Sequence, residues 1–285
     1  MKYSPIGIFD SGYGGLTVLR EIVKTLPGYD YLYLGDNARS PYGPRDFDTI
    51  YHYTLECVQY LLGQGCPLVI LACNTASAKA LRNIQQLALP QIAPGRRVLG
   101  VIRPTAEVIG QFSQTNKVGV LGTVGTVRSE SYLLEIGKFF PELEVFQQAC
   151  PMWVPLVENG ELEGEGVAFF VKKYLHELLE RAAGIDTLLL ACTHYPLLQP
   201  IIQRYLPEHI NIIAQGGIVA ESLKDYLHRH PEIDIKCSKN GQRTFHTTGS
   251  PEDFDGHAAV FYGQKIASVH VNCAKTGTIL QHLED

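Results

Sequence analysis

An approximate internal repeat constrains the fold of this chain more than any other feature. Residues 68–75 (LVILACNT) are echoed by residues 187–194 (TLLLACTH), which places Cys73 and Cys192 119 positions apart. Residues 6–10 (IGIFD) are echoed by residues 118–122 (VGVLG) at an offset of 112. Because the offsets are nearly equal, we predict two copies of one unit, each with a strand, a glycine-containing turn and a later strand that ends in cysteine. Chance matches between ordinary apolar strands are the alternative.

Alternation of two hydrophobic periods indicates the fold class. Short apolar runs alternate with longer stretches of helical period, which is typical of α/β proteins with parallel sheets. Strands are expected at residues 6–9, 31–34, 68–71, 98–101, 118–121, 144–147, 187–190 and 211–213. Helices are expected at residues 15–26, 47–63, 75–87, 129–139, 165–183 and 217–227. We therefore predict two similar, pseudo-symmetric α/β domains, with mostly parallel sheets flanked by helices and the active site in the cleft between them.

Composition excludes several classes of function. The 285 residues carry 24 basic and 29 acidic side chains, a net charge of −5, which argues against a protein built to bind nucleic acid. No apolar run approaches 18 residues, so we expect no membrane span. The first ten residues reach Asp10 before any long apolar run, so we expect no signal peptide. Seven cysteines without a CxxC pair indicate reduced thiols in the cytoplasm rather than disulfides, and no metal site is predicted.

The two repeated cysteines are the strongest candidates for chemistry. Each follows a buried strand and precedes an expected helix start, at the edge of a sheet where α/β proteins bind ligands. Amide groups and the helix dipole there favour an anion, so we expect both thiol pKa values to fall below about 8.5. A lone cysteine after a strand is usually a small core residue, but two in duplicated contexts favour function.

Two thiols in one cleft allow more than one chemistry. If they face a substrate from opposite sides, one removes a proton while the other supplies one, which inverts a stereocentre. A redox pair is an alternative. A cysteine hydrolase using Cys192 with His194 is another, although it leaves Cys73 unexplained. A non-catalytic amino-acid-binding module also remains open.

Three loops carry polar residues near the expected strand ends. Asp10 and Ser11 precede a glycine-rich turn, but Thr17 occupies the third glycine position of a dinucleotide fingerprint, so that motif fails. Asp10 is suited to hold an ammonium group or accept a thiol proton, and equally to cap a helix. Thr126 lies in a loop with hydroxyls and amides suited to a carboxylate, although a plain loop fits as well. His194 is placed to share the Cys192 proton, whereas Glu158 alone is typical of a surface charge.

Six short motifs in register resemble glutamate racemases, of the aspartate/glutamate racemase superfamily. They are residues 8–12 (IFDSG), 14–18 (GGLTV), 35–36 (GD), 41–43 (PYG), 72–77 (ACNTAS) and 192–196 (CTHYP). The resemblance implies cofactor-independent interconversion of L- and D-glutamate, which supplies D-glutamate for bacterial peptidoglycan. A racemase of a related acid such as aspartate is the alternative. Glutamate is then the small-molecule substrate, no nucleic-acid or membrane partner is expected, and a homodimer is left open.

The same resemblance implies roles for individual residues. Cys73 and Cys192 correspond to the two catalytic acid/base residues, with Asp10 as the acidic helper of the first, His194 as that of the second, and Glu158 beside His194. The residues expected to bind substrate, with Thr126 added from its loop, are Asp10, Ser11, Tyr42, Gly43, Asn74, Thr75, Thr126, Thr193 and His194.

Domain boundaries follow from the repeat and the resemblance. We predict a first domain from residues 1–100 and 214–264, a second from residues 101–213, and a disordered C-terminal extension over residues 265–285. The chain departs from the resembling pattern at Gln215, where we expect an acidic residue.

Overall fold

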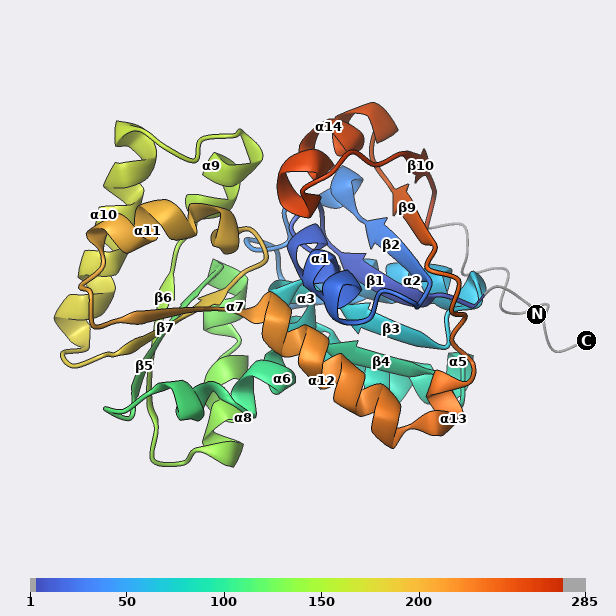
Figure 1. Ribbon diagram of the computed structural model, residues 1–285, viewed down its shortest axis with the longest axis horizontal. Helices are drawn as coiled ribbons and strands as arrows, with labels where there is room; N and C mark the ends of the chain where they lie inside the picture. The colour runs from blue at the N-terminus through green and yellow to red at the C-terminus, as the bar shows by residue number, and fades with distance from the viewer. Residues whose placement is uncertain (1–3, 274–285) are drawn as a thin grey trace, which may run out of the picture.

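Two parallel β-sheets organise the computed structural model, which describes residues 4–273 (Figure 1). The first sheet has the order β10-β9-β2-β1-β3-β4 and the second the order β6-β5-β7-β8, and every pairing within them is parallel. The strands are β1 (Ile6–Asp10), β2 (Tyr31–Gly35), β3 (Leu68–Leu71), β4 (Arg97–Gly100), β5 (Lys117–Gly122), β6 (Glu144–Ala149), β7 (Thr187–Ala191), β8 (Asn211–Ala214), β9 (Arg243–Thr247) and β10 (Ser268–His270).

The predicted duplication is confirmed by strand order. The core of the first sheet runs β2-β1-β3-β4, and the second runs β6-β5-β7-β8, so each strand of one has a counterpart in the other. β1 corresponds to β5 and β3 to β7, the strand pairs that carry the repeated sequences. The fold class is therefore α/β with two similar parallel sheets, as predicted.

The chain crosses between the sheets twice. It leaves the first sheet after β4, builds the second, and returns after β8. We call residues 4–100 and 215–273 the first lobe and residues 101–214 the second lobe. The two lobes lie side by side in Figure 1.

Helices cover both faces of the first sheet because its strands are apolar on both faces. Ile8 packs into the cluster shared with α1 (Leu16–Thr25), α12 (Gln215–Arg229) and α14 (Pro251–Tyr262). The next residue, Phe9, faces the opposite cluster, which contains α2 (Phe47–Gly63), because successive side chains of a strand alternate.

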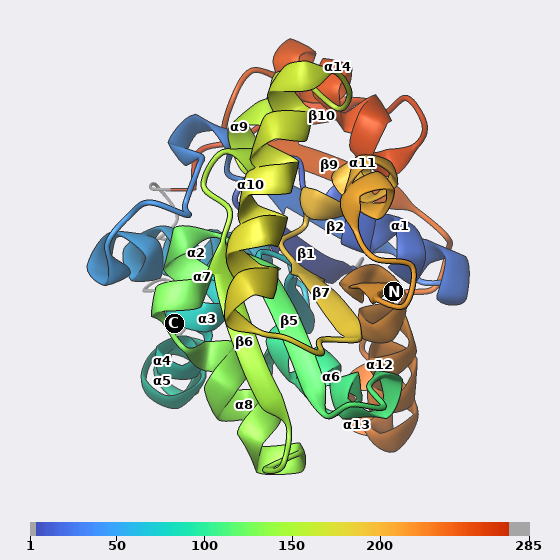
Figure 2. The same cartoon turned by 90° about the vertical axis from the view of Figure 1, so that its left-hand side faces the viewer.

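The second sheet is covered in the same way (Figure 2). One face packs on a cluster that includes α6 (Ile102–Ala106) and α8 (Ser131–Phe139), and the other on α10 (Glu165–Arg181) and α11 (Gln199–Tyr205). Shorter helices α7 (Val124–Arg128) and α9 (Trp153–Glu158) follow β5 and β6.

Local sequence explains where several helices start and stop. The Asp46 carboxylate accepts a hydrogen bond from the Thr49 amide at 2.8 Å and so caps α2. α14 begins with Ser250 as its cap and Pro251 at its first position, and ends at Gly263 with a left-handed φ of +85°.

Eight expected strands are present with ends shifted by at most two residues, but one expected helix is wrong as a single element. Residues 75–87 form α3 (Asn74–Lys79), α4 (Leu81–Asn83) and the start of a π-helical segment at Ile84–Ala88, which is followed by α5 (Leu89–Ile92). A π-helical turn closes hydrogen bonds between residues five apart, so it contains one residue more than an α-helical turn. The spacing of hydrophobic residues in the sequence does not reveal this insertion.

The predicted C-terminal extension is also partly wrong. Ser268–His270 form β10, which pairs with β9 at the edge of the first sheet. A three-residue strand with only Val269 as a large apolar side chain leaves no periodic signal in the sequence. The disorder expected for this extension is therefore wrong at β10, and its last part, residues 274–285, lies outside the described residues.

Candidate active site

A cavity of about 140 Å³ lies between the lobes at the carboxyl ends of the strands. Loops that follow β1, β3, β5 and β7 all contribute to its lining. In α/β sheets this edge, where the strand order reverses, is the usual place for a ligand. Most of the predicted site residues line it: Ser11, Tyr42, Gly43, Cys73, Asn74, Thr75, Glu158, Cys192, Thr193 and His194.

Two predicted site residues lie behind the cavity wall instead of in it. Asp10 is fully buried; its Oδ2 accepts from the Gly12 amide at 2.9 Å and its Oδ1 from the Thr193 hydroxyl at 3.4 Å. Thr126 is also fully buried and reaches the cavity only through Thr75 and Thr123. Both therefore contact residues of the cavity wall and do not themselves line the cavity.

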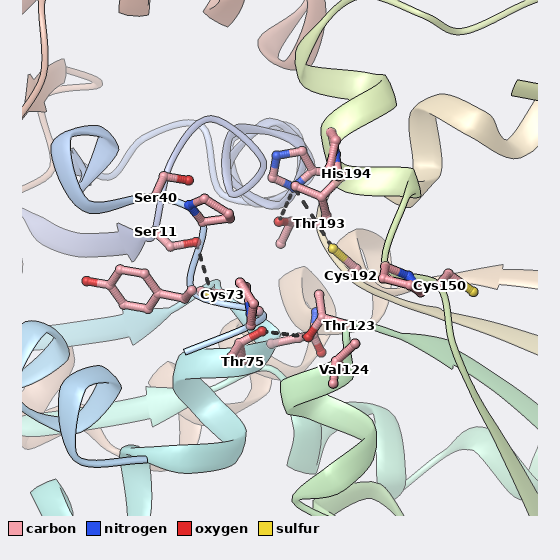
Figure 3. A pocket seen from close by; sticks show the side chains of 18 of the residues that line it. Ser11, Ser40, Cys73, Thr75, Thr123, Val124, Cys150, Cys192, Thr193 and His194 are labelled. Atoms are coloured by element: carbon pink, nitrogen blue, oxygen red, sulfur yellow. Dashed lines mark hydrogen bonds between the residues drawn. The ribbon is translucent and has the colours of Figure 1, made fainter. Parts of the chain in front are cut away.

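Cys73 enters the cavity from the first lobe as the N-cap of α3 (Figure 3). Its Sγ accepts from the Ala76 amide at 3.5 Å and donates to the Ser11 hydroxyl, also at 3.5 Å. Burial, followed by the nearby Asp10 carboxyl, raises the pKa of Cys73 to about 12. The expectation of a lowered pKa is wrong here, because desolvation outweighs the amide at the helix start.

Asp10 shares this apolar setting. Burial raises the pKa of the Asp10 carboxyl, and the positive charge of His194 opposes that effect only in part. Burial therefore raises the pKa of both acids on the Cys73 side of the cavity.

Cys192 enters from the second lobe and has a different partner. No helix starts directly after it: its carbonyl accepts from the Tyr195 amide, which opens a 3₁₀ turn at Tyr195–Leu198. His194 Nδ1 lies 3.9 Å from Cys192 Sγ, and His194 Nε2 lies 3.0 Å from a Glu158 carboxylate oxygen. The histidine thus bridges the thiol and a carboxylate.

This bridge sets the charge of the histidine. Burial lowers the pKa of His194, but the hydrogen bonds to Cys192 and Glu158 outweigh burial and raise it to about 10. An imidazolium donates from both nitrogens, so it stabilises a thiolate on one side while the Glu158 carboxylate holds it on the other. The Cys192 side therefore holds a positive charge next to the thiol.

Close packing fixes the His194 ring. A Cβ on Gly14 would lie 2.5 Å from His194 Nδ1 and 2.2 Å from Thr193 Oγ1, so only glycine fits there. On α14, the ring of Phe261 meets the His194 ring edge to face with centroids 5.2 Å apart. Both contacts come from the first lobe.

Hydroxyl groups from both lobes meet across the cavity. The Oγ1 atoms of Thr75 and Thr123 lie 2.9 Å apart, as Figure 3 shows. The Gly125 amide donates to the Gly43 carbonyl at 2.9 Å, and a Cβ at position 125 would lie 2.8 Å from that oxygen. These contacts hold the two lobes together beside the ligand space.

Tyr42 contributes its ring and not its hydroxyl. The hydroxyl donates to the buried Asp36 carboxylate, which also accepts from Arg39 Nε at 2.8 Å and from Thr248 Oγ1 at 2.7 Å. This network anchors the loop that places Gly43 in the cavity wall.

Sequence reasoning missed part of the lining. Ser40, Val124, Cys150, Val154 and Pro155 also face the cavity, and the last two form an apolar wall before Glu158. The signal available in the sequence was the short apolar helix that ends at the charged residue Glu158. Cys150 directs its Sγ toward the Gln148 carbonyl, 3.8 Å away, and away from Cys192 (Figure 3).

Two features are absent from residues 4–273. No group of three or more metal-binding side chains is arranged around a common point. None of the helices in this range has both the length and the apolar character that crossing a bilayer requires.

The chain is similar over most of its length to proteins of one family. A family described as Asp/Glu/Hydantoin racemase matches residues 6–223. The glutamate racemase of Geobacter metallireducens is 40% identical over 271 residues, 95% of this chain and 97% of that protein. That of Streptococcus gordonii is also 40% identical, over 95% of this chain and all of the relative.

Solved structures give the same result. Glutamate racemase isoform RacE1 of Bacillus anthracis superposes with a TM-score of 0.86 at 36% identity, over 95% of this chain and 98% of that one. The Francisella tularensis glutamate racemase, solved in complex with D-glutamate, gives 0.85 at 30% identity, over 96% of this chain and all of that one. A family match over most of the chain and relatives at this identity lead to one assignment: the chain belongs to the Asp/Glu/Hydantoin racemase family.

Proposed function

We propose that this protein is a glutamate racemase, in which Cys73 and Cys192 act as the two acid/base groups. One observation carries the proposal: two cysteines at the ends of equivalent strands, one from each lobe, line a single cavity. A Cys192–His194 hydrolase would leave the matched position of Cys73 without a role.

The proton transfers balance between the two thiols. In one direction the Cys192 thiolate removes the Cα proton, the Cα–H electron pair stays on the substrate, and the Cys73 thiol delivers a proton to the opposite face. Cys192 ends as a thiol and Cys73 as a thiolate, which is the arrangement that the reverse reaction needs. The environments support this starting state, because burial keeps Cys73 protonated and the His194 imidazolium faces Cys192.

Stabilising the intermediate is the harder task. Removing a proton next to a carboxylate builds a second negative charge on the same group, so fixed donors must be in place before the transfer. Ser11, Thr75 and Thr193 provide hydroxyl groups in the cavity wall. A small, enclosed space strengthens each of these contacts.

The relatives of this chain favour glutamate as the substrate. Relatives at about 40% identity are named glutamate racemases, and the Francisella tularensis structure holds D-glutamate. The aspartate racemase of Picrophilus torridus is 19% identical with a TM-score of 0.52, so it shares the fold alone. Glutamate is therefore favoured over aspartate, and supply of D-glutamate for peptidoglycan is the expected role.

Location and domain organisation form part of the proposal. None of the seven cysteines forms a disulfide, which supports a cytoplasmic enzyme. The two crossings between the lobes, after β4 and after β8, support the proposed domains at residues 1–100 with 214–264 and at residues 101–213.

Polarimetry of the purified protein with L-glutamate, without any added cofactor, tests the proposal. Optical rotation should decay to zero, and in deuterium oxide the product should carry deuterium at Cα. The same assay with L-aspartate should show little change. An acyl-enzyme burst with a glutamate ester, together with constant rotation of L-glutamate, would favour the hydrolase.

A further inference from the structure

Gln215 stands where the chain returns to the first lobe. It is the first residue of α12, only 4% of it is exposed, and it occupies the position at which we expect an acidic residue. Its side chain does not line the cavity, but it contacts Asn74, which does.

Three buried side chains close a ring of hydrogen bonds around this position. Asn74 Nδ2 donates to Gln215 Oε1 at 2.8 Å, and Gln215 Nε2 donates to the Tyr132 hydroxyl at 2.6 Å. The Tyr132 hydroxyl donates in turn to Asn74 Oδ1 at 2.6 Å. Each member gives one hydrogen bond and receives one, and the ring joins the first lobe to α8 of the second.

Contacts outside the ring fix the direction of its bonds. Gln215 Nε2 lies 2.9 Å from Thr105 Oγ1 and 3.3 Å from the Val101 carbonyl, and the Thr105 hydroxyl itself donates to that carbonyl at 3.1 Å. A carbonyl only accepts, so the Gln215 nitrogen must face it and the Gln215 oxygen must face Asn74. The Asn74 nitrogen therefore points to Gln215 and its oxygen to Tyr132.

One group of the Asn74 amide remains for a ligand. A primary amide has two N–H donors, and the ring uses one of them and directs an O–H at the oxygen. The other N–H belongs to a side chain that lines the cavity. A carboxylate only accepts hydrogen bonds, so an N–H is the group that it can use.

We propose that Gln215 and Tyr132 are positioning residues, which hold Asn74 so that it offers an N–H donor to a substrate carboxylate. The inference rests on the proposed racemase function. A carboxylate at position 215 could not donate to Tyr132 or face the Val101 carbonyl favourably, so glutamine and not an acid fits this ring.

Steady-state kinetics of Gln215→Met tests the inference, because methionine keeps the length of the side chain and removes both hydrogen bonds. We expect KM for L-glutamate to rise about tenfold with kcat within about threefold, since Asn74 then loses its fixed orientation for binding. Tyr132→Phe tests the ring independently with a conservative change, and should raise KM about fivefold.

A double-mutant cycle separates positioning from general damage. In an Asn74→Ala background, Gln215→Met should change KM less than about twofold, because the residue through which it acts is gone. Gln148→Met is the matched control: Gln148 is also buried, but it bonds Glu177 and Arg181 away from the cavity, so KM should stay unchanged.

The outcomes are distinguishable. A wild-type protein that racemises glutamate while Gln215→Met and Tyr132→Phe leave KM unchanged would overturn the inference alone. A full tenfold rise in the Asn74→Ala background would overturn it as well. A wild-type protein without racemase activity would refute the proposed function itself.

Discussion

The two lobes deliver their cysteines by the same route and then surround them with opposite chemistry. Each cysteine follows the strand next to the first strand of its repeat, β3 in one lobe and β7 in the other. Cys73 is buried beside Asp10, and burial raises both pKa values. Cys192 instead faces His194, which Glu158 helps to keep positive. Duplication placed the thiols symmetrically, whereas the residues around them differ, with a buried carboxyl beside Cys73 and an imidazolium beside Cys192.

The chemical difference between the two sides of the cavity can affect only some kinetic quantities. L- and D-glutamate have equal free energies in water, so the ratio of kcat/KM in the two directions must equal one for any variant. Differences between the lobes must therefore appear in kcat and KM taken separately, in pH dependence, or in partial reactions.

Removal of either thiol gives the largest expected effect. Cys73→Ala and Cys192→Ala should each lower kcat/KM by about 10³-fold or more, because each removes the proton carrier on one face of Cα. The remaining thiol should still exchange the Cα proton of one enantiomer with deuterium oxide without inversion. NMR of the Cα proton should show opposite enantiomers exchanging in the two variants. Exchange of the same enantiomer in both would place the thiols on one face and contradict the two-sided arrangement.

Replacement of His194 should lower kcat/KM more than replacement of Asp10. His194→Asn should lower kcat/KM about 10²-fold, because asparagine cannot carry the charge that supports a Cys192 thiolate. Asp10→Asn should lower kcat/KM only about tenfold, since Asp10 lies behind the cavity wall and asparagine keeps its shape. The measurement is kcat/KM for L-glutamate in each variant. Equal losses in the two variants would mean that the lobes do not differ as the geometry indicates.

Crowding at the boundary between the lobes gives a third test. Gly14→Ala should lower kcat/KM about thirtyfold, because its Cβ would displace His194 and Thr193. Gly12→Ala is the matched control in the same loop, where the nearest atom to a Cβ is Ser40 Oγ at 3.3 Å, and it should stay within about threefold. A similar loss in both variants would indicate a general disturbance of the loop.

Glu158→Gln should have the smallest effect on rate and a clear effect on pH dependence. The hydrogen bond to Glu158 raises the pKa of His194, so its loss should move the alkaline fall of kcat/KM to lower pH than about 10. Glu161→Gln, at an exposed position nearby, should leave the profile unchanged. An unshifted profile in Glu158→Gln would mean that His194 charge does not control the reaction.

Stability should follow the same linkage. The pKa of His194 is about 10 in the folded state, above its ordinary value of 6.5. The stability that it contributes is therefore full below about pH 6.5 and is lost as pH rises through about 10. The thermal midpoint of Glu158→Gln should differ from wild type most at low pH within that range, and the difference should shrink toward pH 10.

Much of this arrangement could be predicted from the sequence because strand ends are local features. The apolar runs before Cys73 and Cys192 predicted that both thiols follow the carboxyl ends of strands. The repeat predicted two matching sheets. Contacts between lobes were less accessible. Phe261 reaches His194 only because a distant helix of the first lobe packs against it, and the position of Asp10 behind the wall depends on how Thr193 approaches it.

The error in the Cys73 pKa has a physical cause. The helix start was visible in the sequence, but the degree of burial was not, and burial dominates. β10 was missed because three residues carry too little pattern. The roles of individual site residues stay predictions until the variants are measured.

The contact of Phe261 with His194 has a consequence for synthesis of the protein. Both cysteines and His194 leave the ribosome before α14 does, and domains generally fold as the chain emerges. The His194 ring therefore makes its contact with Phe261 only after nearly all of the described chain has been synthesised. Nascent chains that end before Phe261 contain Cys73, Cys192 and His194 but lack the contact that packs against the His194 ring.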